Sequence, residues 1–186
     1  MISNFYTEQE LKQLGFRRCG SDVHISRKCS IYGAEEIVIG DHVRIDDFTI
    51  LSGKITIGNY VHISAFCVLY GRFGIEIGNF CGISPHSMLF SASDDFSGSY
   101  MISPLVPDEL TNLTKGKISM QDYCQVGAAS MVMPGVTMHE GSVCGAYTFV
   151  NHSLERWTIN IGVPARFLRA RDTLVKQKSA GLLSPP

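Results

Sequence analysis

The chain has 186 residues, of which 45% are hydrophobic and 18% charged, and its formal net charge is -1 at pH 7. This length fits one domain with a modest core, and the near-neutral charge disfavours nucleic acid as the main partner, because phosphate binding favours a basic surface. The first residues lack the basic and then apolar layout of a signal peptide, and no apolar run approaches the roughly 18 residues that a membrane span needs. We therefore expect a cytoplasmic protein that binds neither nucleic acid nor membrane.

The first predicted element is a short helix within "TEQELKQLG". Thr7 and Glu10 stand at the spacing of a capping box, Leu11 supplies an apolar position and Gly15 follows as a stop. We expect this helix to pack on the element that follows, and we assign residues 1–20 to a helical lead-in.

Aliphatic residues return at every sixth position through most of the remaining chain. The series is clear in "IGDHVRIDDFTILSGKITIGNYVHISAFCVL" and is interrupted by short slips in "GAEEIVIG" and "YGRFGIEIGN". A period of six matches neither a helix nor the simple alternation of a flat sheet, but it fits short strands that each end in a turn. The members are Ile25, Ile31, Ile39, Ile45, Leu51, Ile57, Ile63, Leu69, Ile77, Ile83, Leu89, Met120, Val126, Val132, Met138, Cys144 and Val150.

A second position in each hexad indicates the same geometry. The fourth residue after the aliphatic one is usually small or β-branched, as in Val43, Thr49 and Cys67. Residues i and i+4 of an extended segment point to one side, so both positions face a narrow interior. Glycine often follows the aliphatic residue, where a turn leaves no space for a bulky side chain. Three hexads therefore close one triangular coil, and stacked coils bury a continuous column of side chains.

The cysteines follow the repeat and show no disulfide pattern. Six are present without a C-x-x-C pair, and a chain without a secretory signal is a poor candidate for a disulfide framework. The repeat places four of them in the small inward position and Cys144 in the large one, so we expect five core cysteines that are poorly placed as nucleophiles. The six are Cys19, Cys29, Cys67, Cys81, Cys124 and Cys144.

The hexads resemble those of the hexapeptide-repeat acyltransferases over about residues 21–170. The resemblance implies an all-β fold, a left-handed parallel β-helix, whose hand the period alone does not define. We assign 21–163 to an acetyltransferase domain with an excursion loop over 95–117, and 164–186 to a C-terminal segment and tail. We expect that segment to form a closing helix or an irregular cover over the open end of the column. The resemblance also implies a homotrimer with active sites between subunits. Other chemistries use the same coil, so the reaction has to be argued from the residues of the site.

The excursion loop is where we expect the chemistry, because an insertion that leaves a rigid coil and rejoins it in register commonly carries function. In the related galactoside and maltose O-acetyltransferases, a turn of the form L-x-x-x-G-H-P begins this loop, and its histidine takes the proton of the acceptor hydroxyl. Aligning that pattern from Leu89 puts Ser93 at the glycine and Asp94 at the histidine. The general base of the O-acetyltransferases is therefore missing here.

Two adjacent carboxylates suit an amine acceptor better than a hydroxyl. A carboxylate with an ordinary pKa of about 4 is a poor base for a hydroxyl. A free amine already carries a lone pair, so it needs only orientation and the removal of a proton from a much more acidic ammonium adduct. Asp94 and Asp95 are the catalytic candidates for these tasks. The alternative is that Asp94 caps the loop through backbone hydrogen bonds.

Histidines are the other candidates for a base. His86 in "ISPHSM" precedes the loop by about one hexad, so we expect it to share the loop's cleft as a base or sugar ligand unless it is an exposed turn residue. His62 in "IGNYVH" lies one coil earlier and is a further candidate. The six histidines are dispersed, which disfavours the three-histidine zinc site of carbonic anhydrases built on this coil, and we expect no metal.

The second half of the chain resembles the coenzyme A side of the family. Small residues in "VGAAS" and again in "CGA" offer backbone groups that we expect to bind the pantetheine arm, and one N–H to stabilise the oxyanion of the tetrahedral intermediate. "GVPAR" resembles the closing G-x-P-A motif beside the adenine, and its arginine is a candidate to meet phosphates. The alternative is that these residues are small only because the tight turns of the coil require it. These cofactor-binding candidates are Gly127, Ala128, Ala129, Ser130, Gly145, Ala146, Gly162, Pro164, Ala165 and Arg166.

The sequence as a whole is similar to enzymes of O-antigen and capsule gene clusters, among them N-acetyltransferases that act on dTDP-4-amino-4,6-dideoxy-D-glucose. This resemblance implies acetyl-CoA as co-substrate and transfer of the acetyl group to the amine of a nucleotide-linked deoxyamino sugar, without an acyl-enzyme. The main alternative is a sugar O-acetyltransferase of the galactoside or maltose type. A carbonic anhydrase-like enzyme and a non-catalytic scaffold protein are disfavoured.

Overall fold

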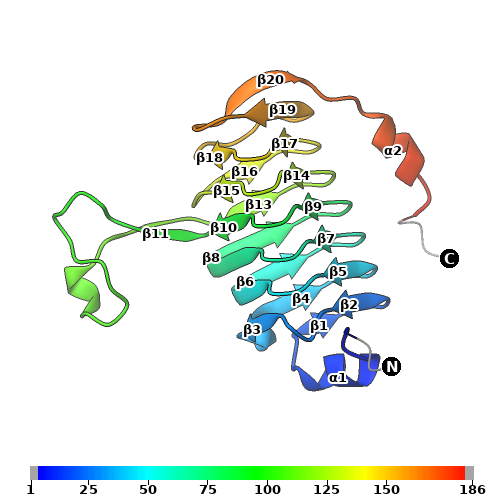
Figure 1. Cartoon of the computed structure of the whole chain (residues 1–186), viewed down its shortest axis with the longest axis horizontal. Helices are drawn as coiled ribbons and strands as arrows, with labels where there is room; N and C mark the ends of the chain where they lie inside the picture. The colour runs from blue at the N-terminus through cyan, green and yellow to red at the C-terminus, as the bar shows by residue number, and fades with distance from the viewer. Residues whose placement is uncertain (1–3, 183–186) are drawn as a thin grey trace.

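The six-residue period winds the chain into a stack of triangular coils. In the computed structural model, which describes residues 4–182, the strands of successive coils pair in parallel from one end of the stack to the other (Figure 1). Two sides of the coils belong to a ten-stranded sheet and the third side to an eight-stranded sheet. The parallel β-helix expected from the repeat is therefore confirmed.

The ten-stranded sheet covers two sides because its long strands bend through a corner. The first half of β6 pairs with β3 and its second half with β4, and β8 repeats this course one coil later. The strands of this sheet are β1 (Arg18–Cys19), β3 (Ser30–Tyr32), β4 (Ile37–Ile39), β6 (Ile50–Ile57), β8 (Val68–Ile77), β10 (Met88–Phe90), β13 (Ile118–Met120), β15 (Met131–Val132), β16 (Thr137–Met138) and β18 (Phe149–Val150).

The eight-stranded sheet forms the third side of every coil. All of its neighbouring strands are parallel except the last pair, β19 and β20, which is antiparallel. Its strands are β2 (Val23–Ile25), β5 (Val43–Ile45), β7 (His62–Ile63), β9 (Gly82–Ile83), β14 (Gln125–Val126), β17 (Val143–Cys144), β19 (Thr158–Ile161) and β20 (Arg166–Ala170).

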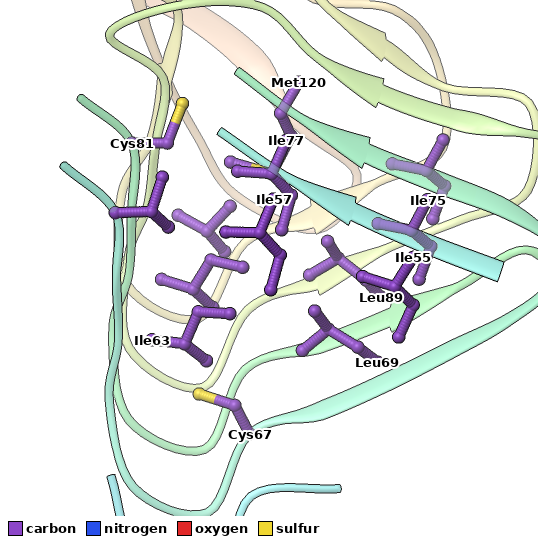
Figure 2. Packing of buried hydrophobic residues seen from close by; sticks show 14 of the residues in the cluster. Ile55, Ile57, Ile63, Cys67, Leu69, Ile75, Ile77, Cys81, Leu89 and Met120 are labelled. Carbon is purple, nitrogen blue, oxygen red and sulfur yellow. The ribbon is translucent and has the colours of Figure 1, made fainter. Parts of the chain in front are cut away.

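The pairing register stacks each aliphatic residue of the repeat on the next. Ile45 pairs with Ile25 below it and with Ile63 above it, and all three side chains are 0% exposed. Figure 2 shows the same arrangement on another side of the coil, where Ile57 lies next to its partner Ile77. Burying one such side chain stabilises the fold by about 1.5–3 kcal/mol. The continuous column is therefore the main source of stability.

The cysteines lie where the repeat predicts, with one exception. Cys67, Cys81, Cys124 and Cys144 are buried, and all six thiols are free. The prediction of a core position was wrong for Cys29, which is only half-buried because it lies in the first coil, with no complete coil beneath it. Burial still raises the pKa of its thiol to about 11.

The N-terminal helix α1 (Glu8–Gln13) begins as predicted. Its N-cap Thr7 accepts a hydrogen bond from the Glu10 N–H at 3.3 Å, and the Glu10 carboxylate accepts one from the Thr7 N–H at 2.8 Å. Gly15 follows the helix with φ +77°, a left-handed conformation that suits glycine. Leu11 is 5% exposed and packs on the first coil, so the expected lead-in is confirmed as a helix.

The loss of stability between neutral and acid pH should depend in part on Glu10. Arg27 donates two hydrogen bonds to its carboxylate, at 2.7 and 2.6 Å, and chiefly this contact, with the Thr7 N–H, lowers the pKa of Glu10 from 4.5 to about 2. A lowered folded-state pKa adds stability above pH 4.5 that is lost as the pH falls towards 2. In thermal denaturation at several pH values, we expect Glu10→Gln to have a lower Tm than the wild type at pH 7 and nearly the same Tm at pH 2. A constant difference across this range would contradict the prediction.

Three corners join the sides of the coils. Corner 1 follows the eight-stranded sheet, corner 2 lies at the bends of β6 and β8, and corner 3 precedes the eight-stranded sheet. Both predicted slips fall at corner 2, one as the short helix η1 (Ala34–Glu36) and the other around Gly74 (φ +102°). Corner 1 comprises residues 46–48, 64–66, 84–86, 127–129 and 145–147. Corner 2 comprises residues 33–36, 53–54, 71–74 and 134–135. Corner 3 comprises residues 40–42, 58–60, 78–80, 121–123, 139–141 and 155–157.

The excursion loop leaves the stack at corner 2. Strands β11 (Ala92–Asp94) and β12 (Leu113–Lys115) pair antiparallel at its base, and a short helix η2 (Asp108–Leu110) lies in its outer part. The chain therefore departs from the coil at Ala92, earlier than the boundary expected at residue 95. Figure 1 shows this loop projecting far from the coils, on the side opposite helix α2 (Leu174–Ser179).

The C-terminal segment differs from its prediction. The strand β20 pairs with the free edge of β19, which satisfies backbone groups that the end of a parallel stack leaves unpaired. Helix α2 does not cover the end of the column but lies against the flank at corner 3 (Figure 1), where the Tyr123 and Ser179 hydroxyls are 2.8 Å apart. The Arg171 side chain stabilises the connection between β20 and α2 by donating hydrogen bonds to the Tyr123 and Gly141 carbonyls, at 2.6 and 2.9 Å.

Within residues 4–182 no helix has the length and apolar character to span a membrane.

Candidate active site

Asp94 lies at the last residue of β11, where the excursion loop leaves the coil. Its side chain lines a cavity of about 330 Å³ together with Arg72 from corner 2 and with Asp108 and Leu113 from the loop. Within residues 4–182 no side chain or backbone group hydrogen-bonds to its carboxylate. The carboxylate is therefore available to an acceptor bound in the cavity.

Asp95 makes contacts of a different kind, although it is the next residue. Its carboxylate accepts hydrogen bonds from the Ser97 N–H at 2.7 Å and from the Asn112 side-chain amide at 2.9 Å. Ser97 and, to a smaller extent, Asn112 lower the pKa of Asp95. These bonds tie the two ends of the loop together, so the capping that the sequence left open for Asp94 is performed by Asp95.

His86 lies at corner 1 and not beside the loop. Its ring stacks on Phe66 with centroids 4.9 Å apart and an angle of 5° between the planes. Strand β10 separates His86 from Asp94, and His86 is not among the residues that line the cavity at Asp94. Within one chain, the two sets of candidates therefore lie at opposite ends of one side of the coil.

Ser84 is a candidate at corner 1 that the sequence analysis missed. It follows β9, is half-buried, and its hydroxyl makes no hydrogen bond to any described residue. Serine also occupies this position in two earlier coils, as Ser26 and Ser64. In the sequence, Ser84 therefore looks like an ordinary member of the repeat and not like a functional residue. The only sequence signal was that glycine replaces serine here in the next coil, at Gly127.

The small residues of corner 1 leave particular backbone groups free. The N–H groups of Gly127, Ala129 and Gly145 donate to carbonyls of neighbouring coils at 2.8–2.9 Å. Those of Ala128 and Ala146 find no acceptor within the part of the chain that the structure describes. Two outward N–H groups on successive coils are therefore free to donate to a ligand.

Corner 3 explains why these groups are free. There, the Asn59 side chain accepts the N–H of Asp41 at 2.7 Å, the Asn79 side chain accepts that of Asn59 at 2.8 Å, and Asp122 accepts that of Asn79 at 2.7 Å. Alanine at the equivalent position of corner 1 has no acceptor atom. The choice between alanine and either asparagine or aspartate thus determines which corner keeps donors for a ligand.

Corner 1 also has a gap in its aromatic stack. Phe48 stacks on Phe66 at 5.0 Å and Phe66 on His86 at 4.9 Å between centroids. The next coil has Ala129 in place of a ring, and the coil after that has Tyr147, which is 76% exposed. We call the space above Ala129 the notch. It lies beside the free N–H of Ala128.

The remaining cofactor candidates divide by exposure. Ser130 is 1% exposed and its hydroxyl donates to the Gly145 carbonyl at 2.8 Å, while Ala165 is 0% exposed. We therefore expect both to shape the coil without touching a ligand. Gly162, Pro164 and Arg166 reach the surface at the C-terminal end of the stack.

Comparison with known proteins agrees with the hexad repeat and the coil. The family model described as bacterial transferase hexapeptide (six repeats) matches residues 36–71. A dTDP-4-amino-4,6-dideoxy-D-glucose acyltransferase from Escherichia coli is 37% identical over 170 residues, which cover 90% of this chain and 88% of the relative. The chain belongs to the hexapeptide-repeat acyltransferases.

Structures of similar acyltransferases extend the comparison. AntD, an N-acyltransferase from Bacillus cereus, is 42% identical with a TM-score of 0.95 over 98% of both chains, in its D94A variant with dTDP and coenzyme A. Its S84C variant, 41% identical with a TM-score of 0.95 and the same coverage, contains dTDP-4-amino-4,6-dideoxyglucose and coenzyme A. The protein described here likewise has aspartate at position 94 and serine at position 84, the residue types that the D94A and S84C variants of AntD replace. An acetyltransferase from Vibrio cholerae, 20% identical with a TM-score of 0.63 over 88% of this chain and 79% of its own, shares the fold.

Within residues 4–182, no three His, Cys, Asp or Glu side chains gather where they could hold a metal ion. The groups at the candidate site are instead a free carboxylate, a hydroxyl and outward backbone N–H groups.

Proposed function

We propose that this acyltransferase moves an acetyl group from acetyl-CoA to the 4-amine of dTDP-4-amino-4,6-dideoxy-D-glucose. The observation that carries the proposal is the unbonded carboxylate of Asp94 in a cavity at the base of the loop. The similarity to the Escherichia coli enzyme and to the AntD complex with this sugar nucleotide supports the acceptor. Another AntD structure contains 3-hydroxybutyryl-CoA, so the acyl chain is the less constrained part of the proposal.

The residues of the chain suit direct attack by the amine. Asp94 accepts a hydrogen bond from the acceptor amine and directs its lone pair at the thioester carbonyl. A new C–N bond forms, the carbonyl oxygen becomes an oxyanion, and the N–H of Ala128 or Ala146 stabilises it. The C–S bond then breaks, the electron pair leaves with sulfur, and the proton lost by the ammonium adduct ends on the CoA thiol. The Ser84 hydroxyl is a further donor at this corner.

A cysteine acyl-enzyme is disfavoured by burial. Cys144, which directly precedes the small residues Gly145 and Ala146, is 0% exposed, and burial raises the pKa of its thiol to about 11. A thiol is a weak nucleophile when it is neutral and inaccessible. Transfer within one ternary complex therefore fits the chain better than a two-stage reaction.

We propose that the complete site forms between subunits of a homotrimer. Asp94 and the notch are separated within one chain, so a second chain is needed to bring them together. The excursion loop carries apolar side chains that find little cover in one chain, such as Phe96 (80% exposed) and Leu105 (92% exposed). Apolar surface of this kind marks contact sites. In the trimer, the loop of one subunit covers corner 1 of the next.

The proposed reaction fits one kind of cellular role. An N-acetylated nucleotide sugar is an activated building block for surface polysaccharide, and we propose O-antigen or capsule synthesis in the cytoplasm as the setting. The acetyl group removes the charge of the amine before the sugar is used.

The proposed function is tested with a panel of acceptors and acetyl-CoA, with thiol release as the readout. We expect turnover with dTDP-4-amino-4,6-dideoxy-D-glucose and none with galactosides or maltose. Mass spectrometry of the product should show one added acetyl group on nitrogen. Turnover with the galactosides alone would assign the protein to the sugar O-acetyltransferases.

A further inference from the structure

We propose that Arg72, assisted by Lys115, binds the diphosphate of the nucleotide sugar. This inference rests on the proposed function and adds a binding residue that neither the sequence analysis nor the comparisons identify. It starts from the cavity at Asp94, because Arg72 is the one cation among the residues that line it. The cavity volume of about 330 Å³ lies in the range typical of small-molecule sites.

The backbone of corner 2 presents Arg72 to this cavity. Arg72 lies at the bend of β8, between Gly71 and Gly74, the latter with φ +102°. A Cβ atom on Gly71 would lie 2.7 Å from the Lys54 carbonyl oxygen, so the coils approach too closely there for any side chain. The bend therefore directs its first long side chain, Arg72, away from the stack.

The Arg72 guanidinium is not used by the fold. No described carboxylate lies within salt-bridge distance of it, and Cζ lies 5.5 Å from the centroid of the Phe73 ring. A flat aromatic ring beneath a guanidinium holds its plane while leaving its N–H groups free. This arrangement suits two parallel hydrogen bonds to phosphate oxygens.

A second cation faces the same ring. Lys115, on the returning strand of the loop, places Nζ 5.7 Å from the centroid of Phe73. Both cations line a smaller cavity of about 260 Å³ next to the first, and Arg72 belongs to both cavities. Two positive groups match the two charges of a sugar-linked diphosphate. Asp108 also lines both cavities, and because its negative charge repels phosphate, the diphosphate must lie nearer to Arg72 and Lys115 than to Asp108.

The chemistry of the acceptor supports this placement. In a hexopyranose, carbon 1 bears the diphosphate and carbon 4 bears the amine, at opposite ends of the ring. A site for this sugar therefore needs a carboxylate at one end and cations at the other. Asp94 and Arg72 supply groups of these two kinds in one cavity, and the second carboxylate there, Asp108, also lines the cavity at Lys115.

The test compares Arg72→Ala and Arg72→Lys with the wild-type protein, using Lys54→Ala as the matched control. Lys54 is a cation at the same corner one coil earlier, and it does not line the Asp94 cavity. We expect Arg72→Ala to raise the KM for the dTDP-sugar by about 10- to 100-fold, since a charged hydrogen-bonding partner is lost. The kcat and the KM for acetyl-CoA should change by less than about threefold, Arg72→Lys should recover part of the loss, and Lys54→Ala should resemble the wild type.

Direct binding of dTDP, measured by calorimetry, separates this inference from the proposed function. If the wild type turns over the dTDP-sugar but Arg72→Ala keeps its KM and its affinity for dTDP, the assignment of Arg72 is wrong and the proposed function stands. If the wild type neither turns over the sugar nor binds dTDP, both are wrong. A loss of dTDP affinity in Arg72→Ala with an unchanged Tm supports the assignment.

Discussion

Replacing Asp94 by asparagine is expected to lower kcat for N-acetylation by about 100-fold or more, the range in which a positioned proton acceptor contributes. Asparagine keeps the size of the side chain, so the cavity and the loop should stay intact. It loses the negative charge that attracts the acceptor amine and accepts its proton. Steady-state kinetics should therefore show a large fall in kcat with little change in the KM for acetyl-CoA.

Asp95→Asn is the matched control because the two aspartates are adjacent. Its new amide oxygen can still accept the Ser97 N–H, while its new amide nitrogen faces the Asn112 amide and loses that bond. We expect a lower Tm or easier proteolysis of the loop, with kcat within about threefold of the wild type. An unchanged rate in Asp94→Asn would remove Asp94 from the chemistry, and a greater loss in Asp95→Asn would exchange their roles.

The core could be predicted from the sequence because burial in this fold repeats with the hexad. Ile63, Ile83 and Val126 stack on one another at the inward position of successive coils, and each is at most 1% exposed. The inward position depends on the strand and turn of one hexad, so a local pattern is sufficient. The handedness of the coil could not be predicted in this way, because no local pattern determines it. It was inferred from the resemblance alone.

The roles within the candidate site depend on contacts that no pattern contains. Asp94 and Asp95 look alike in the sequence, and only the position of Asn112, across the loop, distinguishes the bonded carboxylate from the free one. His86 is close to Asp94 along the chain, but the triangular coil places it at a different corner. The strand β20 forms because the last coil leaves an open edge, which is a property of the whole stack.

Ala129→Phe should keep or raise the Tm of the protein and at the same time weaken its use of acetyl-CoA. The rings before and after the notch, His86 and Tyr147, have φ values of +62° and +55°, and Ala129 has +55°, so the backbone there already suits an aromatic residue in this chain. A ring at Ala129 would continue a stack spaced by about 4.9 Å, and each aromatic pair stabilises by about 0.5–1.5 kcal/mol. We expect an equal or higher Tm. The same ring would fill the notch beside the Ala128 N–H and raise the KM for acetyl-CoA by about tenfold or more.

Ala129→Gly is the control for this change because it keeps the notch open. Its KM for acetyl-CoA should stay within about threefold of the wild type, and both variants should have the same native mass in solution, which excludes lost assembly as the cause. The KM for the dTDP-sugar should change less than that for acetyl-CoA in Ala129→Phe, since we place the sugar at the Asp94 cavity. Full activity in a stabilised Ala129→Phe would mean that the thioester arm does not pass through the notch, and the assignment of corner 1 to coenzyme A would then be wrong.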